Sequence, residues 1–424
     1  MKYTKTVLDN GLRIITVPMK DNPAITVLVL VEAGSKYETK QNNGISHCLE
    51  HMCFKGTIKR PKALDIAREF DQLGALNNAF TSHEHTGYYA KAGYRQLDKV
   101  VDLLSDIYLH STFGAAELAR EKGVIIEEIN MYEDSPQDLV WNLLYETLYG
   151  DQPAGWDVIG TKELITGFQS ADLVNYHQKH YVASATTVVV AGEFDEAKVL
   201  ALVKEKFAAV STAEAPTKRA IIENQTEPVV AVKSKITDQA HLVLAVRTFD
   251  RYQSEKNYQL AILASLLGGG MSSRLFQKIR EELGAAYYVF ATPSAYTDHG
   301  FLALAAGADK SRVKEIVTVM INECHRLKDE LVSETELQQV KGGIIGRLDL
   351  RLETSQAVAN FYGGQEVHRE KIENIDEQIK QLSKVTANEI QKLAQEIFHN
   401  DRLNLVVVGN GYEAAKLKPL LDLS

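Results

Sequence analysis

The sequence "TTVVVAGEFDEAKVLALV" (residues 186–203) recurs in altered form near the C-terminus as "NLVVVGNGYEAAKLKPLL" (404–421). Both begin with a run rich in β-branched residues, reach a glycine and continue with helical spacing, so each predicts a strand that turns into a helix. The glycines of the two turns, Gly192 and Gly409, are 217 residues apart. This spacing indicates an internal repeat.

Two further pairs of segments keep nearly the same spacing. "AITVLV" (24–29) corresponds to "HLVLAV" (241–246) at the offset of 217 residues, and "KGVIIEEINMYED" (122–134) corresponds to "KGGIIGRLDLRLET" (341–354) at 219. Similar β-rich runs can arise by chance, but three matches in the same order make chance a poor explanation. The sequence therefore predicts two homologous halves of about 210 residues that share one α+β fold.

The small, polar, proline-containing segment "AAVSTAEAPTKRA" (208–220) is the best candidate for a linker between the halves. We therefore predict an N-terminal domain over 1–212 and a C-terminal domain over 213–424. A chain of 424 residues is also longer than a single hydrophobic core usually organises. Four segments before the linker show helical spacing: 44–54, 62–73, 95–110 and 115–148.

The composition is that of an ordinary soluble globular protein, with 45% hydrophobic and 24% charged residues. The formal net charge of −9 argues against a general nucleic-acid-binding protein. Three cysteines cannot form a disulfide framework, so we expect a reducing compartment. The N-terminal segment lacks the apolar core of a signal peptide, and no apolar run is long enough to span a bilayer. We therefore expect a cytoplasmic protein without membrane insertion.

The segment "HCLEH" (47–51) places two histidines and a glutamate within five residues of a predicted helix. On a helix, His47 and His51 share one face, and Glu50 lies beside them. Two neutral imidazoles at this spacing can hold one Zn²⁺, and the carboxylate can act on a water that the metal activates. A single buried histidine is more often a core residue than a ligand, but the pair with a glutamate favours a metal site.

A catalytic zinc has three protein ligands, so we expect a third ligand on a neighbouring element. The helical segment 121–134 offers Glu121, Glu127 and Glu128. Glu121 and Glu128 are seven residues apart and share a face, whereas Glu127 points about 100° from Glu128. A solvated acidic face is the simpler interpretation, but the apolar residues between them indicate that one side of this helix is buried.

The repeat separates these residues from the requirements of the fold. All four candidates are replaced in the second half: His47, Glu50, His51 and Glu128 correspond to Ala264, Leu267, Gly268 and Arg347. A residue that maintained the fold would be expected in both copies. The candidates therefore look like function added to a scaffold.

Four segments resemble the signature blocks of pitrilysin-type inverzincin zinc metallopeptidases: "GISHCLEHMCFKGT" (44–57), "NNAFTSHEHTGYY" (77–89), "EKGVIIEEINMYED" (121–134) and "SSRLFQKIREELGAAYYV" (272–289). The closest branch is that of the mitochondrial processing peptidase and its bacterial single-chain relatives. The resemblance covers essentially the whole chain. It implies two homologous α/β-sandwich halves, each a mixed sheet with helices packed on it, that form a clamshell around a central chamber.

The resemblance also implies roles for the residues around the histidines. His47 and His51 match two zinc-binding histidines, and Glu128 matches the third ligand. Glu50 matches the general base, and Glu121 matches an auxiliary acid that supports activity. These roles imply one Zn²⁺ per chain and a zinc metalloendopeptidase that hydrolyses short or unfolded peptides.

Substrate contacts follow from the same resemblance. Arg280 and Tyr287 match a pair that the second half supplies near the scissile carbonyl. Asn78, Ala79 and Thr81 match an edge strand that pairs with the peptide backbone. By themselves, Arg280 and Tyr287 would be interpreted as a surface charge and a packed aromatic residue. With the resemblance, the C-terminal half has no metal ligands but contributes to substrate binding.

The resemblance also bears on the partners of this chain and on an alternative function. The family makes a homodimer plausible. No organelle-targeting segment precedes the first strand, so we do not carry over an organelle-processing role. Some relatives divide the metal motif and the Arg/Tyr pair between two chains, whereas this chain contains both. The alternative is a non-catalytic structural or chaperone-like subunit on the same fold, but such proteins usually lose a ligand or the base.

Overall fold

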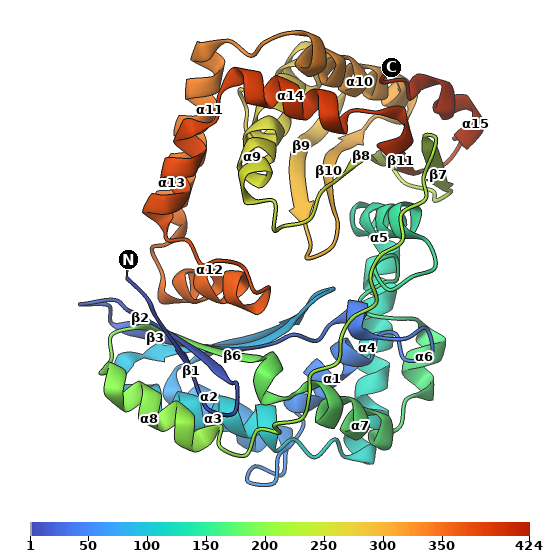
Figure 1. Cartoon of the computed structure of the whole chain (residues 1–424). Helices are drawn as coiled ribbons and strands as arrows, with labels where there is room; N and C mark the ends of the chain where they lie inside the picture. Colours follow the sequence, from blue (N-terminus) through green and yellow to red (C-terminus); the bar gives the residue numbers. More distant parts are fainter. Residues whose placement is uncertain (1) are drawn as a thin grey trace. The chain divides into compact units, whose positions relative to one another are not determined.

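The computed structural model of the chain describes residues 2–424, which divide into two compact units. Each unit contains one mixed β-sheet with helices packed on it (Figure 1). Unit 1 comprises residues 2–129, 157–219 and 349–374, and unit 2 comprises residues 130–156, 220–348 and 375–424. The predicted α+β class, with two sheets and helices packed on them, is confirmed.

Unit 1 is built on six strands: β1 (Thr4–Val7), β2 (Arg13–Pro18), β3 (Ala24–Val31), β4 (Leu76–Thr81), β5 (Thr86–Gly93) and β6 (Thr186–Gly192). Their order in the sheet is β1-β2-β6-β3-β5-β4. β6 runs parallel to β2 and antiparallel to β3. β4 lies at an edge, where it pairs with β5 alone among the described strands.

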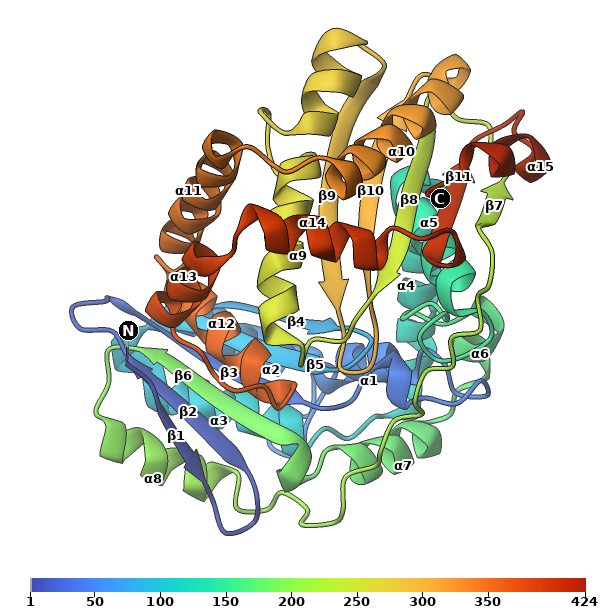
Figure 2. The ribbon, with the colours of Figure 1, turned by 45° about the horizontal axis from the view of Figure 1, so that its top comes forward.

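Unit 2 is built on five strands: β7 (Val229–Lys233), β8 (Ala240–Thr248), β9 (Ala286–Ala295), β10 (Gly300–Ala308) and β11 (Leu403–Val408). Their order is β7-β11-β8-β10-β9 (Figure 2). β11 runs parallel to β7 and antiparallel to β8. The five strands therefore take the places that β2, β6, β3, β5 and β4 hold in unit 1, which confirms the internal repeat.

Each unit also contains helices of its own. Those of unit 1 are α1 (Ile45–Cys53), α2 (Ala63–Leu73), α3 (Leu97–Leu109), α6 (Lys162–Gly167), α7 (Ser170–His180), α8 (Glu196–Lys206) and α12 (Ser355–Val367). Those of unit 2 are α5 (Pro136–Tyr149), α9 (Ser254–Gly268), the π-helix η4 (Phe276–Glu282), α10 (Val313–Asp329), α13 (Ile375–Lys384), α14 (Ala387–Ile397) and α15 (Ala414–Leu417). Two helices run from one unit into the other: α4 (Ala115–Asp134) and α11 (Glu334–Arg351).

Each sheet is covered on one face by a helix from the other half of the sequence. α12 packs on β3 and β6, where a Cβ atom at Gly363 would lie 2.8 Å from Leu30 Cδ1. α5 packs on β8 and β11 and contributes the buried residues Leu144 and Leu148 to that core. The packing units differ from the predicted continuous domains, 1–212 and 213–424. Residues 130–156, with α5, belong to unit 2, residues 349–374, with α12, belong to unit 1, and the boundary near the linker falls after residue 219.

The prediction of one helical stretch over 115–148 is wrong at its middle. α4 ends at Asp134, and α5 begins at Pro136. Between them, Ser135 caps α5, because its hydroxyl accepts a hydrogen bond from the Asp138 amide at 3.3 Å. Proline suits the first turn of α5 but has no N–H with which to continue the hydrogen bonding of α4.

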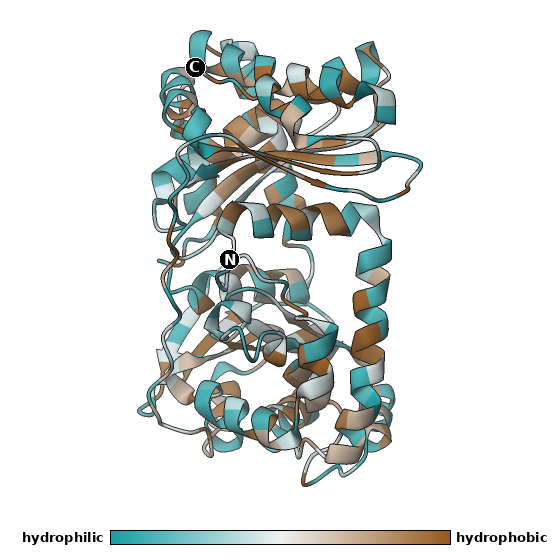
Figure 3. Cartoon of the chain, turned by 90° about the vertical axis from the view of Figure 1, so that its right-hand side faces the viewer, coloured by the Kyte–Doolittle hydropathy of each residue, from teal (hydrophilic) through white to brown (hydrophobic). Residues whose placement is uncertain are grey.

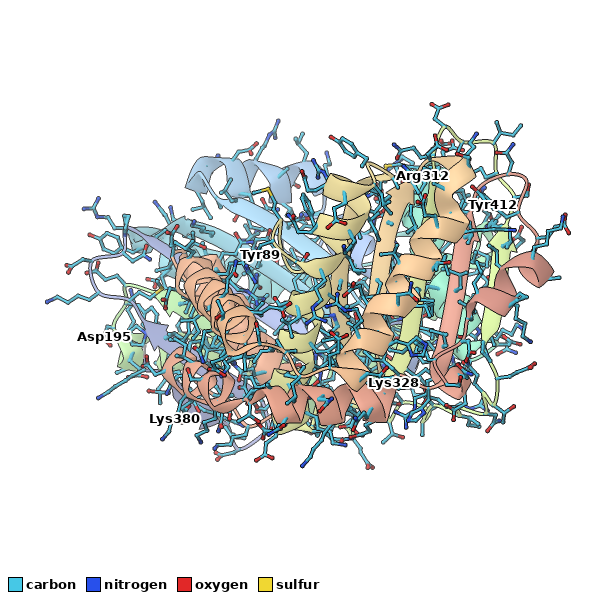
Figure 4. The ribbon with its side chains drawn as sticks, turned by 90° about the horizontal axis from the view of Figure 1, so that it is seen from above. Tyr89, Asp195, Arg312, Lys328, Lys380 and Tyr412 are labelled. Atoms are coloured by element: carbon cyan, nitrogen blue, oxygen red, sulfur yellow. The ribbon has the colours of Figure 1, made fainter. Side chains whose placement is uncertain are left out.

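The buried hydrophobic residues lie mainly in the strands of the two sheets and in the helices packed on them. The central strands are mainly hydrophobic, whereas the helices show hydrophilic residues on their outer faces (Figure 3). In unit 2, α10 is held near both ends: Arg312 Nη1 donates to the Leu283 carbonyl at 2.5 Å, and Lys328 Nζ donates to the Leu423 carbonyl (Figure 4). Among residues 2–424, no helix is both long and apolar enough to cross a membrane.

Candidate metal centre

Helix α1 begins at a glycine that the local packing requires. Gly44 has φ +92°, and a Cβ atom there would lie 2.6 Å from the carbonyl oxygen of Ile159. The Glu38 carboxylate completes this start, since it accepts hydrogen bonds from the amides of Gly44 and Ser46, both at 2.8 Å. These contacts satisfy N–H groups that the first turn leaves unpaired. They also fix the rotation of α1, and therefore the direction of the side chains that follow.

His47 and His51 on α1 and Glu128 on α4 form one group, in which a ligand atom from each lies within 4.8 Å of the others. Glu128 Oε2 is 3.7 Å from His47 Nε2 and 3.5 Å from His51 Nε2. Two ligand atoms of a tetrahedral zinc, at bond lengths of about 2.0–2.1 Å, lie about 3.3–3.4 Å apart. The donor set and its spacing therefore fit a zinc ion. Glu127, the neighbouring acid, is exposed and lies outside the group.

The ring of His51 is held in place through Nδ1, the nitrogen that does not face Glu128. Its Nδ1 lies 2.9 Å from Glu121 Oε1, and the second oxygen of that carboxylate lies 2.7 Å from Lys55 Nζ. A hydrogen bond from Nδ1–H to a carboxylate leaves Nε2 free to bind a metal. His47 differs, because its Nδ1 is buried and has no hydrogen-bond partner within residues 2–424.

Glu50 lies beside the group and is oriented by the edge strand β4. Thr81 Oγ1 donates a hydrogen bond to Glu50 Oε2 at 2.5 Å. Thr81 therefore contacts the candidate base directly, a contact that its position in the sequence did not reveal. The other two residues expected to bind substrate, Asn78 and Ala79, also lie on β4, and Asn78 Oδ1 accepts a hydrogen bond from the Ala79 amide at 2.9 Å.

The protonation equilibria of the group are strongly shifted. Burial and the nearby His51 lower the pKa of His47 to about 4, against the attraction of Glu128. Burial also acts to lower the pKa of His51, but hydrogen bonds to Glu121 and Glu128 outweigh it and raise that pKa to about 9. Burial raises the pKa of Glu50, and the hydrogen bond from Thr81 offsets only part of this effect. A metal ion would displace the proton of His51.

Arg280 and Tyr287 belong to unit 2, where the structure brings them together. The Arg280 guanidinium lies 4.8 Å from the ring centroid of Phe276 and 5.9 Å from that of Tyr287. Arg280 is exposed and has no acidic partner in the described part of the chain, and Tyr287 is 74% exposed. A guanidinium beside two aromatic rings is attracted to their faces, which restricts its orientation.

Sequence reasoning did not identify Lys55 or Phe276 as part of these sites. Lys55 follows His51 by four residues, so the helical spacing offered a signal. Phe276 precedes Arg280 by the same interval. In both cases the four-residue spacing was visible in the sequence. However, Glu121, which pairs with Lys55, is distant in sequence. The contact between Phe276 and Arg280 depends on the local geometry of η4.

Two family descriptions match this chain. Residues 13–162 match "insulinase (peptidase family M16)", and residues 167–344 match "peptidase M16 inactive domain". The first match contains all residues of the candidate metal group, and the second contains Arg280 and Tyr287.

Individual proteins agree with these matches. The chain is 35% identical to the uncharacterized zinc protease YmxG from Bacillus subtilis over 92% of this chain and 95% of that relative. A protease from Helicobacter pylori has the same fold, with a TM-score of 0.88 and 24% identity over 96% of this chain and 99% of that one. A chain of complex III2 from Candida albicans also shares the fold, with a TM-score of 0.85 and 16% identity over 99% of each chain.

Proposed function

Because this chain belongs to peptidase family M16, we propose that it is a zinc-dependent endopeptidase that hydrolyses short or unfolded peptides. One observation carries the proposal: His47, His51 and Glu128 offer three ligand atoms within 4.8 Å of one another, with Glu50 on the same helix as the histidines. Such a set of two imidazoles and a carboxylate leaves a fourth zinc position open for chemistry.

Glu50 is the proposed general base. When bound, zinc would lower the pKa of a water molecule and polarise the peptide carbonyl. Since Thr81 occupies Oε2 of Glu50, Oε1 remains to take a proton from water and deliver it to the nitrogen of the leaving peptide. Burial raises the pKa of this carboxylate, which makes it a stronger base than an exposed glutamate.

Substrate binding is assigned to main-chain pairing and to the Arg/Tyr pair. β4 is a sheet edge, and pairing along an edge tolerates many side-chain sequences. A peptide that paired at Ala79 would replace the contact between the Ala79 amide and Asn78. We assign the Tyr287 hydroxyl to the developing oxyanion and Arg280 to substrate orientation, on the strength of the family resemblance and of their exposure.

Four further parts complete the proposal. We propose one zinc ion per chain and a homodimer from the same resemblance, and a cytoplasmic location from the few, unpaired cysteines. The clamshell around a chamber stays a prediction, and it is the reason for expecting short or unfolded peptides as substrates.

The alternative is a non-catalytic subunit, and the similarity to one solved structure supports considering it. The fold also occurs in a chain of complex III2, so the fold by itself does not choose between the two functions. The complete ligand set and the base beside it favour the peptidase.

The substitution Glu50→Gln tests the proposal. It removes the proton acceptor but keeps the shape of the side chain. We expect zinc content to be unchanged and kcat/KM for peptide hydrolysis to fall by at least about 10²-fold. Wild-type hydrolysis by zinc-loaded Glu50→Gln would contradict the role of the base. Failure of zinc-loaded wild-type protein to cleave a library of unfolded peptides would favour the non-catalytic subunit.

A further inference from the structure

Lys55 ends a chain of contacts that leads to the metal centre. It follows the last residue of α1 by two positions, and its Nζ lies 2.7 Å from Glu121 Oε2. The other oxygen of Glu121 lies 2.9 Å from His51 Nδ1. The opposite nitrogen of that ring, Nε2, faces Glu128 at 3.5 Å.

The carboxylate in the middle of this chain is buried. The side chain of Glu121 is 8% exposed, so water does not easily satisfy its oxygens. A buried carboxylate needs partners for both oxygens, and losing one partner is far more costly than losing an exposed ion pair. Lys55 and His51 are the two partners. Without Lys55, Glu121 would have to rotate or to admit water, and its contact with His51 would loosen.

The metal centre depends on the contact between Glu121 and His51 more than would a site in which both histidines had such a partner. His47 Nδ1 is buried without a hydrogen-bond partner in residues 2–424, so no described hydrogen bond fixes its ring from behind. Of the two histidines, only His51 therefore has its ring oriented through a hydrogen bond at Nδ1 within these residues. Outer partners of this kind typically change metal affinity by about 10–100-fold when removed.

We propose that Lys55 is a positioning residue for the metal: by holding Glu121 it fixes the orientation of the His51 ring and strengthens zinc binding. This inference rests on the proposed function only for the identity of the metal. It predicts an effect on binding that is independent of peptide cleavage.

Lys59 provides a matched control on the same segment. Its ammonium pairs with Asp102, but the Lys59 side chain is 59% exposed and its partner 24% exposed. Exposed pairs of this kind contribute little to stability. Replacing Lys59 therefore removes a lysine and its ion pair without touching the chain that leads to His51.

The experiment measures the zinc affinity of metal-free protein by competition with a chromophoric chelator. We expect Lys55→Met to bind zinc about 10–100-fold more weakly than wild type. Lys55→Arg should restore most of the affinity, because it keeps a cation near Glu121. Lys59→Met should bind like wild type. Lys55→Gln, which keeps a hydrogen-bond donor, replaces Lys55→Met if the latter does not fold, and it should also bind more weakly.

A double-mutant cycle with Glu121→Gln tests the route of the effect. If Lys55 acts through Glu121, adding Lys55→Met to Glu121→Gln should cause no further loss of affinity. The proposal would be overturned by wild-type affinity in Lys55→Met, by an equal loss in the Glu121→Gln background, or by Lys55→Arg binding no better than Lys55→Met. Because the titration requires no substrate, these outcomes remain distinct from a failure of the proposed peptidase activity.

Discussion

Helices α1 and α9 occupy equivalent places in the two units, yet only α1 carries metal ligands. In unit 1, the space between α1 and the edge strand β4 holds the contact between Glu50 and Thr81. In unit 2, α9 packs directly on its edge strand β9: a Cβ atom at Gly268 would lie 2.2 Å from the Ala291 amide nitrogen. Gly268 is the counterpart of His51, so the second unit has no room for a ligand at that position.

The counterpart of Glu128 extends the comparison. Arg347 Nη2 lies 3.3 Å from Ser265 Oγ on α9. Unit 1 thus has a carboxylate suited to a cation where unit 2 carries a cation of its own. The same scaffold can therefore support or exclude a metal, depending on a few side chains and on how closely one helix approaches one strand.

The strongest way to break the comparison is to give α1 the residues of α9. The double variant His47→Ala, His51→Gly should reduce zinc from about one ion per chain to none and abolish peptide cleavage. Chelator treatment of the wild-type protein should have the same effect on cleavage. Metal analysis together with a cleavage assay provides the measurement. Stoichiometric zinc in the double variant would mean that the site lies elsewhere.

The next effect separates two neighbouring acids on α4. Glu128→Ala removes a ligand atom and should weaken zinc binding by more than the roughly 10–100-fold expected for an outer partner. Glu127→Ala should leave the affinity unchanged, because that side chain is exposed and lies outside the group. Chelator competition measures both variants. The reverse result would shift the assignment by one residue.

Gly268 gives a test from the side of unit 2. In Gly268→Ala, the new methyl group would meet backbone atoms of β9, so we expect a loss of about 1–3 kcal/mol in the free energy of unfolding. Gly270→Ala is the control, since a Cβ atom there has nothing within 4 Å. Chemical denaturation monitored by circular dichroism measures both. Equal stability of the two variants would show that the close packing of α9 is not what excludes a side chain.

The pH dependence of zinc binding distinguishes the two histidines. His51 has a pKa raised to about 9 in the metal-free site, so zinc must displace its proton at neutral pH. Affinity should therefore rise about tenfold per pH unit and level off near pH 9. His47, with a pKa of about 4, contributes no such dependence above pH 5. Glu121→Gln should flatten the dependence above neutral pH, because it removes a contact that raises the pKa of His51. A flat profile in wild type would contradict this account.

Several features of this protein could be predicted from the sequence alone, because they depend on residues close together in one element. The 217-residue offset between Gly192 and Gly409 predicted two related units, because equivalent strands and turns need equivalent residues. The helical period placed His47, Glu50 and His51 side by side, and it separated Glu128 from Glu127. These conclusions depend on spacing within one element, which the sequence displays directly.

Tertiary structure decided the contacts that join distant elements. The exchange of α5 and α12 between the units follows from which sheet face each helix covers, and spacing along the chain does not encode that choice. Lys55 reaches Glu121 only because α4 packs beside α1, and Thr81 reaches Glu50 only because β4 does. Whether a buried carboxylate finds its partner depends on distances of a few ångströms between elements. Such distances are set by the packing of the whole unit.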